Sequence, residues 1–174
     1  SVMLEGPTGG INAVDRGLVF VPINSTDVMV DCTGSGGPHL NHLQVNTTRS
    51  AQTPKVGILL AQKSGGGGGT LPQLDNVFVT GSFSTAALYC YGVGDGRIDN
   101  SRIWNHIGTS KWAAAFTRDN FDSIASAYQT IATGEQGVGN WTTTNAEFHD
   151  YKASGATTGH AIRLRGSPAM VFLG

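Results

Sequence analysis

The sequence of 174 residues carries little charge, since Asp, Glu, Lys and Arg make up only 13% of it and the formal net charge is −1. A chain without a basic field does not hold a nucleic acid or an anionic membrane surface, so we expect neither as a partner. No apolar run approaches the roughly 18 residues of a membrane-spanning helix, and no cationic stretch followed by an apolar one opens the sequence. The sequence therefore predicts no membrane insertion.

Cysteine is equally scarce and occurs only at Cys32 and Cys90. Each follows an apolar residue by two positions on a short strand pattern, so both thiols are predicted to be buried. We favour two unpaired core cysteines over a disulfide, although spacing alone does not decide between them. The five histidines show no zinc-binding pair spacing, and GVGDG from Gly92 lacks the helix of a phosphate loop. We therefore expect no metal and no cofactor.

What the sequence does contain is a repeat. Four hexapeptides have Asn or His third and an apolar residue last: LNHLQV from Leu40, LDNVFV from Leu74, IDNSRI from Ile98 and TTNAEF from Thr143. A second apolar strand follows each of them: GILLAQ from Gly57, AALYCY from Ala86, AAAFTR from Ala113 and HAIRLR from His160. An earlier pair, LVFVPI from Leu18 and VMVDC from Val28, precedes them. Every unit is thus predicted to carry two strands in the same order.

This repeat predicts an all-β fold, a parallel β-helix solenoid of about five coils that fills residues 1–174 as a single domain. A coil of three short sides needs roughly 20 to 25 residues, which fits the distance from Leu74 to Ile98. The longer coils then hold insertions, namely the glycine-rich loop Gly65–Gly69 and the segment between Arg118 and Asn140. Within the latter, Asn120–Thr133 has apolar residues at helical spacing and predicts one short inserted helix.

Alternation within the second strands assigns their side chains to two faces. The inward residues are predicted to be Ile58, Leu60, Leu88, Cys90, Ile162 and Leu164. The outward residues are predicted to be Leu59, Tyr89, Tyr91, Arg163 and Arg165. Because parallel strands stack about 4.8 Å apart, the third-position residues Asn76, Asn100 and Asn145 are expected to form a ladder at a bend.

The stacked L-x-N-x-x-V units with a paired downstream strand resemble the pectin-lyase-like right-handed parallel β-helices, and among these the phage tailspikes and tail-fibre depolymerases. The resemblance covers about Leu18 to Leu173 and is one of architecture, without a catalytic signature. It implies a homotrimer, extracellular or on the virion, that binds host-surface polysaccharide and in some members cleaves it. The apolar final strand AMVFLG and the missing amphipathic cap at the start predict a fragment or one part of a larger assembly.

Two acidic residues form the candidate catalytic pair. Asp75 and Asp99 occupy the second position of units that are one bare coil apart, so their strands are expected to stack about 5 Å apart. Two carboxylates at that distance repel, which favours a proton on one of them, as the general acid of retaining glycoside hydrolysis requires. The alternative is a solvated pair of turn aspartates that accept hydrogen bonds from local amides.

A set of aromatic and polar residues forms the candidate substrate-binding surface: Tyr89, Tyr91, Trp104, His106, Trp112, Arg102, Glu147 and His149. Flat rings present apolar faces to sugar rings, while the polar groups take the sugar hydroxyls. The fifth positions of the four units form one column of Gln44, Phe78, Arg102 and Glu147, so Arg102 and Glu147 are expected to form a surface ion pair. The alternative for this surface is packing beneath the inserted helix or at a trimer interface.

Three functions therefore stay open. The leading one is a module that recognises bacterial surface polysaccharide through the outer face of the solenoid. The second is a glycoside hydrolase or lyase of the same architecture, which uses acidic residues. The third is a purely structural solenoid. The fold does not choose among them, because function depends on the site.

Overall fold

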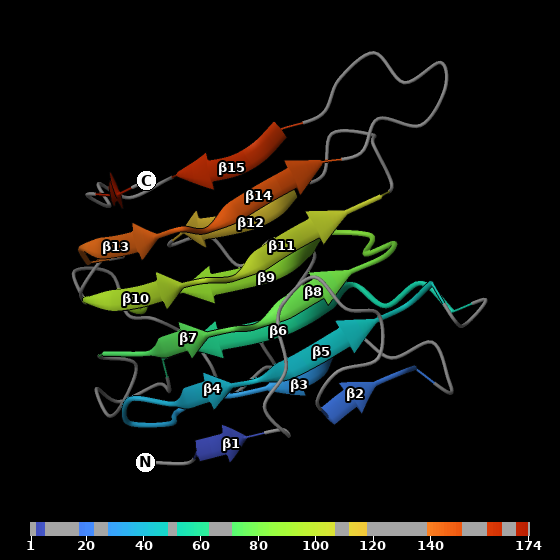
Figure 1. Cartoon of the computed structure of the whole chain (residues 1–174), viewed down its shortest axis with the longest axis horizontal. Coiled ribbons are helices and arrows are strands. Elements are labelled where there is room, and N and C mark those ends of the chain that lie inside the picture. Colours follow the sequence, from blue (N-terminus) through green and yellow to red (C-terminus); the bar gives the residue numbers. More distant parts are fainter. Residues whose placement is uncertain are drawn as a thin grey trace.

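The computed structural model describes residues 3–5, 18–22, 28–48, 52–62, 71–106, 112–117, 139–150, 160–164 and 170–173. All regular elements within these ranges are β-strands, and they form three sheets (Figure 1). Sheet A contains β1 (Met3–Glu5), β4 (His39–Asn41), β7 (Gln73–Asp75), β10 (Gly96–Asp99), β13 (Trp141–Thr144) and β16 (Met170–Leu173). Sheet B contains β2 (Leu18–Phe20), β5 (Leu43–Asn46), β8 (Phe78–Thr80), β11 (Arg102–Asn105) and β14 (Glu147–Asp150). Sheet C contains β3 (Val28–Asp31), β6 (Val56–Ala61), β9 (Ala86–Tyr91), β12 (Trp112–Thr117) and β15 (His160–Leu164).

Within each sheet, neighbouring strands are parallel, and successive strands of the chain belong to sheets A, B and C in turn. A strand of sheet A is followed by one of sheet B and then one of sheet C, and each strand pairs with the strand three places further on. Figure 1 shows this stacking from the N-terminal strands toward β15. The predicted all-β architecture with parallel strands is confirmed. We call one passage through the three sheets a coil.

The hexapeptide repeats are each split by a bend between sheets A and B. Their third residues have positive φ angles of 50° at His42, 52° at Asn76, 47° at Asn100 and 49° at Asn145. Asn enters this left-handed region more readily than other residues with a Cβ. The predicted bend is confirmed, but the prediction of two strands per unit is wrong. A coil has three, because the left-handed residue breaks the hexapeptide into two strands, such as β7 and β8.

The bend is held together by neighbouring coils. The backbone N–H of Asn76 donates to the carbonyl oxygen of Asp99 at 3.2 Å, and that of Asn100 to Thr144 at 2.9 Å. Among the side chains, Asn145 Nδ2 donates to Asn100 Oδ1 at 3.0 Å, whereas Asn100 Nδ2 donates to an oxygen of Asp75 at 3.3 Å. The predicted asparagine ladder therefore exists between two of its three members and continues into an aspartate.

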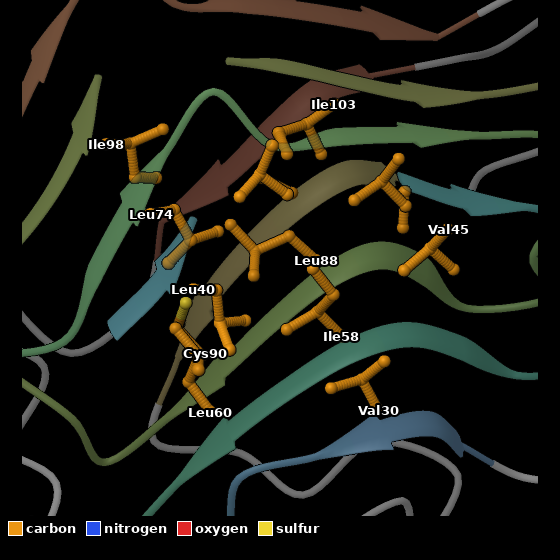
Figure 2. Packing of buried hydrophobic residues seen from close by; sticks show 14 of the residues in the cluster. Val30, Leu40, Val45, Ile58, Leu60, Leu74, Leu88, Cys90, Ile98 and Ile103 are labelled. Atoms are coloured by element: carbon orange, nitrogen blue, oxygen red, sulfur yellow. The ribbon is translucent and has the colours of Figure 1, made fainter. Parts of the chain in front are cut away.

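The core lies between the three sheets and consists of stacked columns of aliphatic side chains (Figure 2). One column is built by Leu40, Leu74 and Ile98 of sheet A, another by Val45, Val79 and Ile103 of sheet B, and a third by Val30, Ile58 and Leu88 of sheet C. Equivalent residues meet because parallel pairing places the same position of each unit one strand apart. The inward placement of Ile58, Leu60, Leu88 and Cys90 is confirmed, and Ile162 packs against this core.

Leu164 has the predicted inward register but is not buried. It pairs in register with Phe116, which belongs to the core column, yet it is 48% exposed. The reason is its position in β15, the last strand in the order of sheet C, where no described strand covers its far side.

Both cysteines are free thiols, as predicted. Cys90 lies fully buried in the core, and burial raises its pKa well above the ordinary value. Cys32 follows β3 and is half-buried, with a pKa raised to about 11 by burial and by the Asp31 carboxylate. Desolvation disfavours the thiolate, so neither cysteine is an activated nucleophile.

Some predictions concern residues that the structure does not describe. The loop Gly65–Gly69, the helix over Asn120–Thr133 and the outward Arg165 lie outside the described residues. In the part of the chain that is described, no helix is long and apolar enough to cross a membrane.

Candidate functional site

The outer face of sheet B carries most of the predicted binding residues. Alternation in β8, β11 and β14 directs Phe78, Arg102, Trp104, Glu147 and His149 away from the core. The inward positions of the same strands are Val79, Ile103 and Phe148. In register, Arg102 lies between Phe78 and Glu147, and Trp104 lies opposite His149. Residues from three successive units thus meet on one surface.

The rings on this surface are in contact. Trp104 meets Phe78 edge to face, with ring centroids 5.2 Å apart and an interplanar angle of 88°. On the next coil, the His149 ring lies 5.8 Å from Trp104 at 40°. The Arg102 guanidinium is 5.7 Å from the centre of the same indole. Edge-to-face and cation–π contacts of this kind hold aromatic side chains in place at a surface. We call Phe78, Arg102, Trp104, Glu147 and His149 the aromatic row.

The predicted ion pair within the aromatic row is confirmed. Arg102 Nε lies 3.2 Å from Glu147 Oε2, with both side chains partly exposed. The whole predicted column is also confirmed in register, since Gln44 pairs with Phe78 and Phe78 with Arg102. Gln44 itself is only 2% exposed. The accessible part of this face therefore begins near Phe78 and extends toward β14.

A pocket of about 290 Å³ adjoins the aromatic row at its β14 end. It is lined by Ser101, Arg102, Thr143, Asn145, Ala146, Glu147, Phe172 and Leu173. Phe172 and Leu173 are 56% and 51% exposed and form an apolar wall, while Asn145 and the Arg102–Glu147 pair supply polar groups. Arg102 and Glu147 belong both to the aromatic row and to the pocket lining, so the two adjoin and we treat them as one candidate site. Phe172 approaches from the inner side, because it continues the column of Ile98 and Thr143 and its ring meets that of the inward Phe148, with centroids 6.5 Å apart.

Sequence reasoning missed most of this pocket. In the sequence, Phe172 and Leu173 are marked only as part of the apolar strand AMVFLG. They join the site because β16 pairs with β13, which places Phe172 beside Thr143 and Leu173 beside Thr144. The repeat did indicate two of the pocket residues, since Asn145 is the third residue of its unit and Glu147 is the fifth.

His106 follows β11 and lies at the other border of the aromatic row. Its Nε2 is 3.3 Å from Thr80 Oγ1, and its ring is half-buried. Burial lowers the pKa of His106, and the positive charge that His149 can carry lowers it further. His149 therefore lies close enough to His106 to influence its protonation.

The remaining predicted binding residues are on the outer face of sheet C. Tyr89 and Tyr91 do point away from the inner core, as predicted, but they are only 0% and 5% exposed. They belong to a second apolar cluster together with Val56, Leu59, Ala61, Ala86 and Ala115. A ring without exposed surface offers no stacking face to a sugar, so the prediction that these tyrosines line a binding surface is corrected.

Trp112 packs against the same second cluster. It is half-buried, and the Arg163 guanidinium lies 4.6 Å from the centre of its ring. Trp112 is thus on a different sheet from Trp104, and the structure does not bring these two tryptophans into one site.

The candidate catalytic pair lies on the outer face of sheet A. Asp75 and Asp99 are register partners in the neighbouring strands β7 and β10, so the predicted adjacency is confirmed. Asp75 Oδ1 accepts hydrogen bonds from Asn76 Nδ2 at 3.1 Å and from Asn100 Nδ2 at 3.3 Å. Asp99 Oδ2 forms an ion pair with Arg97 Nε. The second oxygen of Asp99 is buried and accepts no hydrogen bond from any described residue.

Comparison with protein-family models, with curated proteins and with solved structures found no match to this chain. In the described ranges, no three His, Cys, Asp or Glu side chains are grouped so that they hold a metal ion. What this site binds must therefore be argued from its own side chains.

Proposed function

We propose that this chain is a polysaccharide-recognition module, a right-handed parallel β-helix of about five coils with the architecture of phage tailspikes and of the pectin-lyase-like proteins. On this proposal it acts outside the cell or on a virion and contacts host-surface glycans. The observation that carries it is the Arg102–Glu147 ion pair, which joins the aromatic row to a pocket of about 290 Å³.

The chemistry of the combined site suits a chain of sugar rings. A pyranose has an apolar face that packs against indole or phenyl rings, here Trp104 and Phe172. Its hydroxyls need donors and acceptors, which Arg102, Glu147 and Asn145 supply. Because the residues of the aromatic row come from successive coils, a linear polymer along the axis meets Phe78, Trp104 and His149 in turn. This combination of flat rings and paired charges supports glycan binding over a purely structural role.

The test is retention on a panel of capsular and lipopolysaccharide glycans. Trp104→Ala and Phe172→Ala should each weaken binding by about 1 to 3 kcal/mol, as is usual when an aromatic interface residue is truncated. Val171→Ala is the matched control, because Val171 is the equally exposed neighbour of Phe172 and is not among the pocket residues. If no glycan is retained, or if Val171→Ala weakens binding as much as Phe172→Ala does, the proposal fails.

A second candidate function is glycoside hydrolysis by Asp75 and Asp99. The favouring observation is their register pairing, because neighbouring strands are about 4.8 Å apart and retaining glycosidases hold their carboxyl groups about 5 Å apart. Asp75→Asn and Asp99→Asn should then each abolish the release of new reducing ends with binding retained. Asp31→Asn, at an exposed aspartate of sheet C, is the control. Unchanged cleavage in both variants would eliminate the pair as catalytic.

We also propose that the chain self-associates, as a homotrimer. Leu164 is 48% exposed, and exposed apolar side chains favour burial against another copy. Light scattering at micromolar concentration should report three times the monomer mass of 18.1 kDa. A clean monomer would refute this assembly.

A further inference from the structure

Two histidines flank the central indole of the aromatic row. His149 of β14 lies with its ring 5.8 Å from that of Trp104. His106 lies two residues beyond Trp104 in the chain and reaches toward β8, where its Nε2 is 3.3 Å from Thr80 Oγ1. A ligand group seated against Trp104 is therefore near both imidazoles, which come from different coils.

Among the described residues, the charged groups on the strands that carry or adjoin these histidines are Arg102, Glu147 and Asp150. On β11 the one full charge is Arg102, and it is paired with Glu147 of β14 at 3.2 Å. β14 also carries Asp150, which alternation directs to the inner side of the strand and whose carboxylate oxygens are buried. β8 carries no charged residue. For the described residues of this outer face, the formal charges of Arg102 and Glu147 cancel when both imidazoles are neutral, and the sum is two positive charges when both are protonated.

We infer that the aromatic row selects an anionic sugar and takes up protons when it binds one, with His106 and His149 as the proton-accepting groups. This inference rests on the glycan binding proposed above and adds the charge class of the glycan and its pH dependence. The shared ligand chemistry is an anionic substituent, such as a uronate carboxylate or a sulfate ester, on a pyranose ring.

The coupling has a definite sign. Burial and the neighbouring His149 both lower the pKa of His106, so the free site resists charging at neutral pH. An anion beside the imidazole favours its protonated form, and by linkage a protonated imidazole binds the anion more tightly. Affinity for an acidic glycan should consequently rise as the pH falls through the range in which histidine titrates.

The experiment compares a glycan array at pH 7.5 and pH 5.5. The array holds uronate-containing, sulfated and neutral oligosaccharides, and each uronate also in carboxyl-reduced form, where an alcohol replaces the carboxylate. Retained glycans should be anionic, with affinity about tenfold higher at pH 5.5, since each exposed charge contact is worth about two- to fivefold. The carboxyl-reduced forms should lose this gain. Calorimetry in two buffers of different ionisation enthalpy should show net proton uptake.

Three variants assign the effect to residues. His106→Gln and His149→Gln keep a polar side chain without the titrating charge, so each should remove part of the pH dependence and the double variant all of it. The control is His39→Gln, at a histidine of β4 in sheet A that lies outside the aromatic row. This control should leave both the affinity and its pH dependence unchanged.

The outcomes separate this inference from the proposed function. If glycans bind equally at both pH values, or neutral glycans bind as well as acidic ones, glycan recognition stands and proton-coupled selection is overturned. The same holds if the double histidine variant keeps the full pH dependence. If no glycan of any class binds at either pH, both are overturned.

Discussion

The outer faces of sheets B and C obey the same alternation but meet different surroundings. On sheet C, Tyr89 and Tyr91 point away from the core and are nonetheless buried. On sheet B, Trp104 also points away from the core but is partly exposed, and His149 beside it is exposed. Alternation thus reports the direction of a side chain, and direction alone does not reveal whether the face it reaches is covered.

The sequence did contain a signal for this difference. The sheet C strands VGILLA and AALYCY are buried at all six positions, and parallel strands covered on both faces read as continuous apolar runs. The sheet B strand RIWN instead begins with a charged residue and alternates between partly exposed and buried positions, as a strand with one open face does. An aromatic residue inside a continuous apolar run is therefore better interpreted as core than as binding surface.

The sharpest test of this comparison is truncation of one aromatic residue on each face. Tyr89→Ala should lower the free energy of unfolding by about 3 to 5 kcal/mol, because it empties a fully buried site. Trp104→Ala should cost about 1 to 2 kcal/mol, because its ring is already partly in water. Urea denaturation monitored by circular dichroism measures both. Equal losses would show that the two faces are equally covered.

A smaller loss of folding stability is expected when Gly57, a glycine of sheet C that faces the core, is replaced by alanine. A Cβ on Gly57 of β6 would lie 2.6 Å from the carbonyl oxygen of Ala87 and 2.8 Å from Val79 Cγ1. Gly57→Ala should therefore destabilise the fold by about 1 to 3 kcal/mol through overpacking. Gly36→Ala is the control, because a Cβ there meets nothing within 4 Å. An unchanged denaturation midpoint for Gly57→Ala would contradict the tight packing of this sheet.

Charged contacts on both outer faces should contribute still less. Arg102→Gln removes the ion pair with Glu147 on sheet B, and Arg163→Gln removes the cation over Trp112 on sheet C. Each should change the free energy of unfolding by less than about 1 kcal/mol, since water solvates such charges well in the unfolded chain too. A loss above about 2 kcal/mol for Arg163→Gln would contradict this, because it would mean that the contact with Trp112 stabilises sheet C as much as a buried core residue does.

The smallest expected difference is in how folding stability depends on pH. The pKa of His106 on sheet B is lowered in the folded chain, so the unfolded chain binds the proton first as the pH falls. Its contribution to stability is thus complete above the ordinary histidine pKa of about 6.5 and is lost below it. His106→Gln should match the parent at pH 7.5 and lose less thermal stability at pH 5. Identical pH profiles of Tm would contradict this.

The period of the repeat was sufficient to predict the parallel stacking, the bend at Asn76 and Asn100, and the pairing of Arg102 with Glu147. These features depend on the position of a residue within its unit, and parallel register brings equal positions together. The same rule made Asp75 and Asp99 neighbours. Their partners, Asn100 and Arg97, also come from the units themselves.

Only the tertiary structure decided which outward residues are accessible. Tyr89 points outward and is nonetheless buried, whereas Phe172 continues the inward column of Ile98 and Thr143 and is nonetheless 56% exposed, and no periodicity within a unit records either fact. The pocket formed because β16 stacks on β13 and brings Phe172 to Glu147, two residues that belong to different coils. The sequence by itself determined the register of this protein, because register follows from local alternation. The packing of distant segments determined its surface.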